Sequence, residues 1–214
     1  MLWREILALV IAYLLGSIPA AYIVTRVTRH KDIRQVGGGN IGSLNTIKFV
    51  GRLPGAVVAF VDVGKGALAV VIAFFVLGVP ALFVMLAAIF SVVGHMWMIF
   101  LKFSGGRGMA PMVGSVVTVF CVYAEWFGLG IFAGITLLPM VITRNIPLSL
   151  TIGLVGLPFI AWFTTYSATA TIMAVVLGLL TGGKFLPTGL KDLRAWRARR
   201  KLNSAGKPDK ERKN

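Results

Sequence analysis

The sequence predicts an all-α polytopic membrane protein, folded as a bundle of seven transmembrane helices. Of its 214 residues, 57% are hydrophobic and only 14% are charged, and the mean hydropathy is +0.85. Soluble domains carry about 45–50% apolar and ~25% charged residues. Apolar runs long enough to span a bilayer recur along the chain. This composition argues against a soluble enzyme, a nucleic-acid-binding domain and a disordered chain.

Seven apolar runs account for the expected helices. The first is interpreted as a span rather than a signal peptide, because no convincing charged segment and cleavage site frame it. Pro111, Pro139 and Pro158 lie inside later runs, where neighbouring helices can satisfy the freed backbone groups. We place the spans at residues 5–25, 53–77, 80–101, 108–124, 127–143, 147–165 and 168–184.

Lys and Arg in the short connections predict the orientation. They occur in the segment 26–52, at Lys102 and Arg107, at Arg144 and in the C-terminal segment, which lie on one side of a seven-span bundle. The connections on the other side contain Glu125 and no Lys or Arg. Positive residues concentrate in cytoplasmic loops. We therefore expect the N-terminus outside and the C-terminus in the cytoplasm.

The net charge of +15 points to a membrane surface rather than to nucleic acid. Residues 184–214 hold 11 Lys and Arg against three acidic residues. A basic segment next to a span is typical of a cytoplasmic tail that faces anionic lipid. We expect one transmembrane domain over residues 1–202 and a disordered basic cytoplasmic tail over residues 203–214.

Two polar segments contain unusually many glycines. The first, residues 32–46, has three consecutive glycines followed by Asn40, Ser43 and Asn45. Glycines allow the backbone to approach a ligand closely, although a flexible cytoplasmic loop would have the same composition. The second, residues 94–110, surrounds Arg107 with glycines just before an expected helix. Backbone N–H groups, a helix N-terminus and a guanidinium group together suit a phosphate; the alternative is an ordinary positive-inside loop.

Three ionisable residues lie within the expected spans. Asp62 and Lys65 are three residues apart and can pair on one helix face. We interpret them as an internal ion pair, with a role at the substrate site as the alternative. His95 lies near the cytoplasmic end of the third span, where it is either a packing residue or part of a functional site.

At these segments the chain resembles the bacterial acyl-phosphate:glycerol-3-phosphate acyltransferases. The resemblance extends from Gly16 to about residue 180, and the order and spacing of the motifs agree. The matching residues are 16–19, 32–34, 39–42 with Asn45, Gly51 and Arg52, Asp62 with Lys65 and Gly66, Gly94 with His95, and 101–108.

The resemblance implies a seven-helix enzyme of phospholipid biosynthesis in the bacterial plasma membrane, with a cytoplasmic active site. The implied reaction transfers an acyl group from acyl phosphate to glycerol 3-phosphate, without a metal or another cofactor. We expect Gly105, Gly106, Arg107 and Gly108 to hold the phosphate of acyl phosphate, with His95 and Lys102 nearby. His95, Lys102 and Arg107 are the expected catalytic residues. Asn40, Asn45 and Arg52 would form the facing wall. Membrane lipids are the other expected partners, nucleic acid is not one, and the oligomeric state stays open.

The chain also departs from the family pattern. Gly38 stands where the family has serine, Arg107 replaces a lysine, and Pro111 and Pro147 replace hydroxyl residues. The family's C-terminal His-Arg-x-Asn motif does not appear near residues 186–193. Alternatives to the family reaction are therefore a relative with an altered acceptor or without catalysis, and a lipid or anion transport protein.

Overall fold

The computed structural model describes residues 2–185, and within that range it consists of helices and connections without strands. Helix α1 (Leu2–Ser17) continues beyond a break as α2 (Ala20–Arg29). The short α3 (Ser43–Phe49) leads into α4 (Arg52–Val71), which is extended by a π-helical turn to Val76. There follow α5 (Ala81–Met96), α6 (Met109–Val122), α7 (Trp126–Thr143), α8 (Ile146–Thr165) and, last among the described residues, a helix over Ala168–Phe185, called the last helix below.

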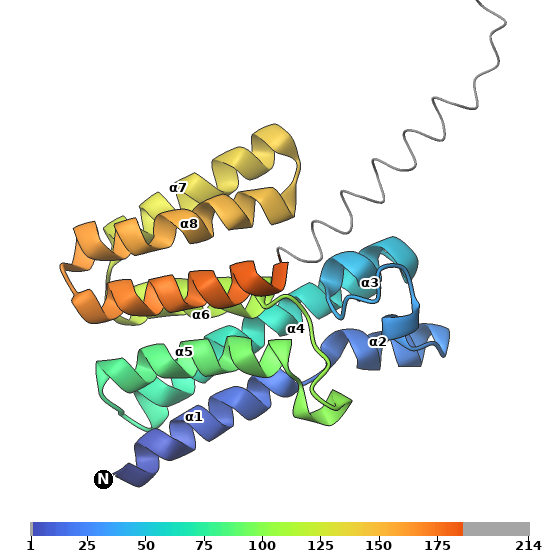
Figure 1. Ribbon diagram of the computed structural model, residues 1–214, viewed down its shortest axis with the longest axis horizontal. Helices are drawn as coiled ribbons and strands as arrows, with labels where there is room; N and C mark the ends of the chain where they lie inside the picture. Colours follow the sequence, from blue (N-terminus) through green and yellow to red (C-terminus); the bar gives the residue numbers. More distant parts are fainter. Residues whose placement is uncertain (1, 186–214) are drawn as a thin grey trace, which may run out of the picture.

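The prediction of an all-α membrane bundle is confirmed. Six segments of the described chain are long and apolar enough to cross a membrane, and α6 is a shorter apolar helix between them. Figure 1 shows these helices running back and forth in one bundle. The first span is longer than predicted: it runs from Leu2 to Arg29. It is interrupted at Pro19, which has no backbone N–H to continue the helix.

Glycines allow the central helices to pack closely. A side chain on Gly16 of α1 would overlap the Ser91 carbonyl of α5, and one on Gly66 of α4 would overlap the Pro111 carbonyl of α6. Small residues at such crossings let two helix backbones approach each other. The helices α1, α4, α5 and α6 therefore form a tightly packed centre, which fixes the position of the loop between α5 and α6.

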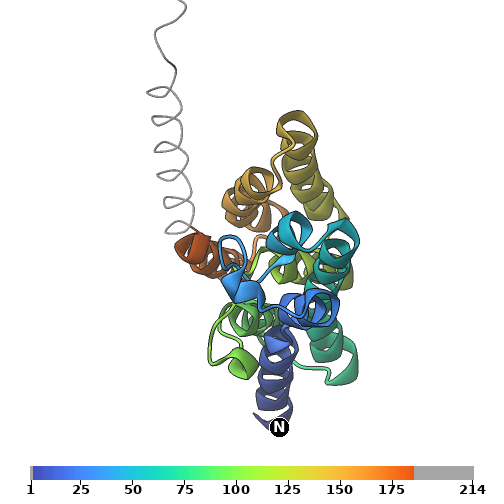
Figure 2. The ribbon, with the colours of Figure 1, turned by 90° about the vertical axis from the view of Figure 1, so that its right-hand side faces the viewer.

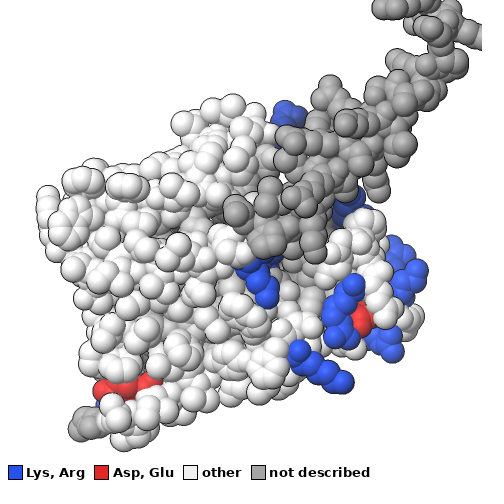
Figure 3. Space-filling model, viewed as in Figure 1, with Lys and Arg blue, Asp and Glu red and all other residues white. Residues whose placement is uncertain are grey.

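The basic connections lie together at one end of the bundle. Figure 3 shows Lys and Arg side chains gathered at the end that carries α2 and α3, and Figure 2 looks onto that end. The connection after α5 and the one between α7 and α8 reach the same end, whereas the turns that follow α4, α6 and α8 lie at the other (Figure 1). The common face that the sequence predicts is therefore present.

Candidate functional site at the basic end of the bundle

A polar cavity of about 870 Å³ opens at the basic end. It brings the two Gly-rich segments together, although about 50 residues separate them in the sequence. One wall comes from residues 37–49 and the other from residues 107–110, with Asp62 of α4, His95 of α5 and Pro147 of α8 completing it. Its lining residues are Gly37, Gly38, Asn40, Ile41, Gly42, Ser43, Leu44, Asn45, Lys48, Phe49, Asp62, His95, Arg107, Gly108, Met109, Ala110 and Pro147.

The first wall is an ordered loop that its own side chains close. The amide of Asn45 donates to the carbonyls of Val36 and Asn40, at 2.9 and 3.1 Å. Gly37 and Gly39 adopt positive φ angles of 61° and 70°, which side chains other than glycine rarely do. Asn45 is therefore both a cavity residue and the side chain that fixes the loop.

At the start of this loop, Asp32 holds a short turn. Its carboxylate accepts from the Arg34 backbone N–H at 2.9 Å and from the Arg34 guanidinium at 2.6 Å. These hydrogen bonds lower the pKa of Asp32 below its usual value. The turn leads directly into the glycines of the cavity wall.

The second wall begins at the end of the Gly loop, residues 105–108, which lies against the end of α5. The Gly106 N–H donates to the His95 carbonyl at 3.0 Å. Gly108 has a φ of 80° and directly precedes α6, so that the first residues of this helix, Met109 and Ala110, line the cavity. Backbone N–H groups at a helix N-terminus are donors for an anion.

Cationic and polar groups surround the cavity. Arg107 is half-buried, and its guanidinium lies 5.2 Å from the centre of the Phe185 ring. Lys48 enters from α3 on the opposite side. In the floor, Asp62 lies 2.9 Å from Lys65, and both are buried. This arrangement of Arg, Lys and N–H donors is suited to a phosphate group.

The structure brings most of the sequence-predicted site residues together. Asn40, Asn45, Asp62, His95, Arg107 and Gly108 line the cavity, Gly105 and Gly106 form the backbone behind it, and Lys65 contacts Asp62 from below. Lys102 and Arg52 are exposed and are not among the cavity residues. Lys102 follows a 3-10 turn and has a left-handed backbone, as does Phe103 after it.

Sequence reasoning did not single out Lys48 for the site. The spacing of the residues could have indicated it, because Lys48 follows Asn45 by three residues on the same helix and therefore shares a face with it. The family's C-terminal motif position, near residues 186–193, and the predicted tail at residues 203–214 lie outside the described residues.

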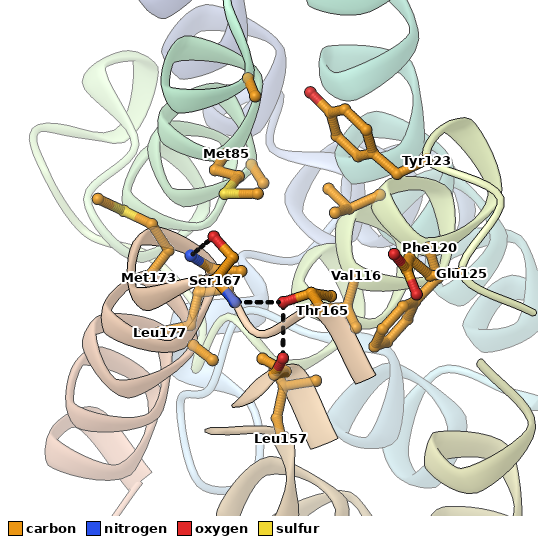
Figure 4. Close-up of a pocket in the computed structure, with 16 residues that line it drawn as sticks. Met85, Val116, Phe120, Tyr123, Glu125, Leu157, Thr165, Ser167, Met173 and Leu177 are labelled. Atoms are coloured by element: carbon orange, nitrogen blue, oxygen red, sulfur yellow. Dashed lines mark hydrogen bonds between the residues drawn. The ribbon is translucent and has the colours of Figure 1, made fainter. Parts of the chain in front are cut away.

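A second cavity, of about 290 Å³, lies toward the opposite end of the bundle (Figure 4). It lies between α5, α6, α8 and the last helix, and its walls are mostly apolar, with Met85, Phe120 and Leu177 among them. Among the described residues that line it, Glu125 is charged and none is Lys or Arg. Without a cation it has little to hold a phosphate, which leaves the cavity at the basic end as the candidate site.

The fold and the cavity define an integral membrane protein with a polar, glycine-lined site at one end of its transmembrane helices. The chain belongs to the glycerol-3-phosphate acyltransferase family, which it matches over residues 6–185.

Relatives and solved structures agree with this assignment. Glycerol-3-phosphate acyltransferase 1 of Dehalococcoides mccartyi is 44% identical over 196 residues, which cover 92% of this chain and 94% of the relative. The crystal structure of PlsY, an integral membrane glycerol 3-phosphate acyltransferase, in its glycerol 3-phosphate form has a TM-score of 0.75 and 27% identity, and covers 89% of this chain and 92% of its own. Its lysophosphatidic acid form has a TM-score of 0.70 and 26% identity, with the same coverage of both chains.

Proposed function

We propose that this chain acylates glycerol 3-phosphate to give lysophosphatidic acid for phospholipid biosynthesis, with acyl phosphate as the donor. The family match and the relatives' names support the acyltransferase activity. The solved neighbours hold glycerol 3-phosphate in one form and lysophosphatidic acid in the other, which supports this acceptor and product.

The observation that carries the proposal is the single cavity formed by both Gly-rich segments. The reaction involves two phosphate groups, one on the donor and one on the acceptor. We assign the donor phosphate to Arg107, Gly108 and the first turn of α6. The acceptor phosphate lies opposite, near Asn40, Asn45 and Lys48. The hydroxyl of the acceptor is then held near the acyl carbon of the donor.

In the proposed step, the 1-hydroxyl oxygen of glycerol 3-phosphate bonds to the acyl carbon. The bond between that carbon and the phosphate oxygen breaks, and the hydroxyl proton passes to the released phosphate. Because acyl phosphate is already activated, a protein nucleophile is unnecessary. Holding the two substrates together and stabilising charge on the departing phosphate supply the acceleration, and Arg107 is the group best placed to do the second.

We also propose that the protein lies in the bacterial plasma membrane with the cavity at the cytoplasmic face. The basic connections at the cavity's end support this orientation, since Lys and Arg concentrate on the cytoplasmic side. A reporter fused at the C-terminus should be active only in the cytoplasm, and one inserted beside Glu125 only outside. The reverse pattern would contradict the orientation.

The activity test uses the purified protein in detergent with acyl phosphate and a panel of phosphorylated polyols. We expect release of inorganic phosphate and formation of an acylated glycerol 3-phosphate, identified by mass spectrometry. Transfer to another polyol instead would indicate an altered acceptor. Absence of transfer to every acceptor would overturn the proposal in favour of a non-catalytic relative.

A further inference from the structure

Asp62, Lys65 and His95 form a buried cluster in the floor of the cavity. Nζ of Lys65 lies 2.9 Å and Nδ1 of His95 lies 3.6 Å from the same carboxylate oxygen of Asp62. All three side chains are at most 4% exposed. Asp62 and His95 nevertheless line the cavity, so that a carboxylate lies beneath the site whose proposed ligands are phosphates.

Lys65 compensates the charge of this carboxylate. It is not a cavity residue. Its ammonium group pairs with Asp62 and donates to the Ile18 carbonyl at 3.1 Å. Ile18 lies at the break between α1 and α2. An uncompensated carboxylate at this position would repel a phosphate strongly, since buried charges interact in a low effective dielectric constant.

His95 connects this pair to the Gly loop. Its carbonyl accepts from the Gly106 N–H at 3.0 Å, and its imidazole packs directly on Gly106, since a Cβ there would overlap Nε2. The position of the imidazole therefore limits where the loop backbone can lie. On the opposite side of the ring, Nδ1 lies 3.6 Å from the Asp62 carboxylate, which is an electrostatic contact and too long for a hydrogen bond.

We propose that Asp62, Lys65 and His95 are positioning residues for the phosphate-binding Gly loop. Lys65 neutralises Asp62, and the pair fixes the imidazole against which the loop backbone packs. The inference rests on the proposed function only for the chemistry of the ligand, a phosphate. A purely structural ion pair would matter only for the fold. The proposed role requires instead that substitutions in the cluster change the affinity for phosphate in variants that still fold.

The first test replaces the imidazole and leaves the ion pair in place. His95→Asn is compared with His30→Asn, an exposed histidine at the end of α2 that is not a cavity residue. We expect His95→Asn to weaken binding of inorganic phosphate about tenfold, because the Gly loop loses the ring that limits its position, and to raise KM for acyl phosphate. His30→Asn should match the wild type. Circular dichroism and the unfolding temperature check that both variants fold.

The second test separates charge from packing. Lys65→Met leaves Asp62 unpaired, whereas the double variant Asp62→Asn, Lys65→Met is neutral; Gly64→Ala on the same helix is the control, because a Cβ there meets no other atom within 4 Å. We expect Lys65→Met to bind inorganic phosphate more weakly than the double variant does. If Lys65→Met does not fold, the proposal is tested by the phosphate binding of the double variant and of His95→Asn.

Several outcomes would overturn the inference. Wild-type phosphate affinity and KM in His95→Asn would remove the positioning role of the imidazole. A double variant as weak as Lys65→Met would remove the charge argument, and a fall in kcat with unchanged phosphate affinity would indicate a direct chemical role. A wild-type protein that binds phosphate but transfers no acyl group would contradict the proposed function alone, because the phosphate measurements still test the cluster.

Discussion

The Gly106 N–H donates a hydrogen bond to the His95 carbonyl at 3.0 Å, which joins the Gly loop to the end of α5. His95 lies in an apolar run and Gly106 in a polar loop, 11 residues apart. Their contact leaves no room for a side chain, because a Cβ on Gly106 would overlap both the imidazole and the Ile41 carbonyl. The two cavity walls therefore touch at this glycine.

Two glycines of the site should respond differently to substitution. Gly106→Ala is expected to destabilise the protein by about 1–3 kcal/mol through overpacking and to reduce activity. Gly38→Ser, which restores the family residue, should stay within about 0.5 kcal/mol of the wild type, because a Cβ at Gly38 meets nothing within 4 Å. It should also raise activity toward glycerol 3-phosphate. Thermal unfolding and acyl transfer of the two variants, measured together, check this contrast.

Removing one member of the Asp62–Lys65 pair should cost about 3–5 kcal/mol, because a buried charge is left unpaired. Removing both should cost less than the sum of the single changes. Unfolding measured for Asp62→Asn, Lys65→Met and the double variant gives the coupling. Additive losses would contradict a buried ion pair.

Arg107→Ala removes a charge-assisted contact to the proposed donor phosphate, worth roughly 1.5–3 kcal/mol. We expect kcat/KM to fall about ten- to hundredfold. Arg107→Lys should recover part of the loss, because it keeps the charge but not the bidentate geometry. Lys31→Ala, an exposed cation that is not a cavity residue, is the control. A folded Arg107→Ala protein with wild-type rates would refute the assignment.

Lys48 and Lys102 should differ, because the cavity contains only the first of them. Lys48→Met is expected to raise KM for glycerol 3-phosphate several-fold, whereas Lys102→Met should change it much less. Steady-state kinetics with each substrate varied in turn provides the measurement. A larger effect at Lys102 would favour the sequence-based expectation over the geometry described above.

Acid should loosen the turn that precedes the first cavity wall. The hydrogen bonds from Arg34 lower the pKa of Asp32 in the folded state. The stabilisation is therefore present above the usual Asp pKa of about 3.9 and is lost as the pH falls through the lowered value. In that pH range the amides of residues 33–36 should lose their protection from hydrogen exchange, measured relative to the intrinsic rate at the same pH. The Asp32→Asn variant should show fast exchange at every pH; protection equal to the wild type would contradict this role.

The sequence by itself determined the class of fold and predicted the end of the bundle at which the candidate cavity lies. Apolar runs of spanning length have few alternatives to transmembrane helices, because every backbone polar group must be satisfied within the bilayer. The distribution of Lys and Arg then placed both Gly-rich segments at one end. These signals are local, so they can be recognised without knowing which helices touch.

Only the tertiary structure decided which side chains share the cavity. Lys48 lines it together with Asn45 of the same short helix, whereas Lys102 is exposed and is not among the lining residues. The cluster of Asp62, Lys65 and His95 joins two helices, and its contact with the Gly loop depends on a close approach at Gly106. The contacts of His95 with Asp62 and with the Gly loop arise from packing between segments that spacing within one helix does not relate.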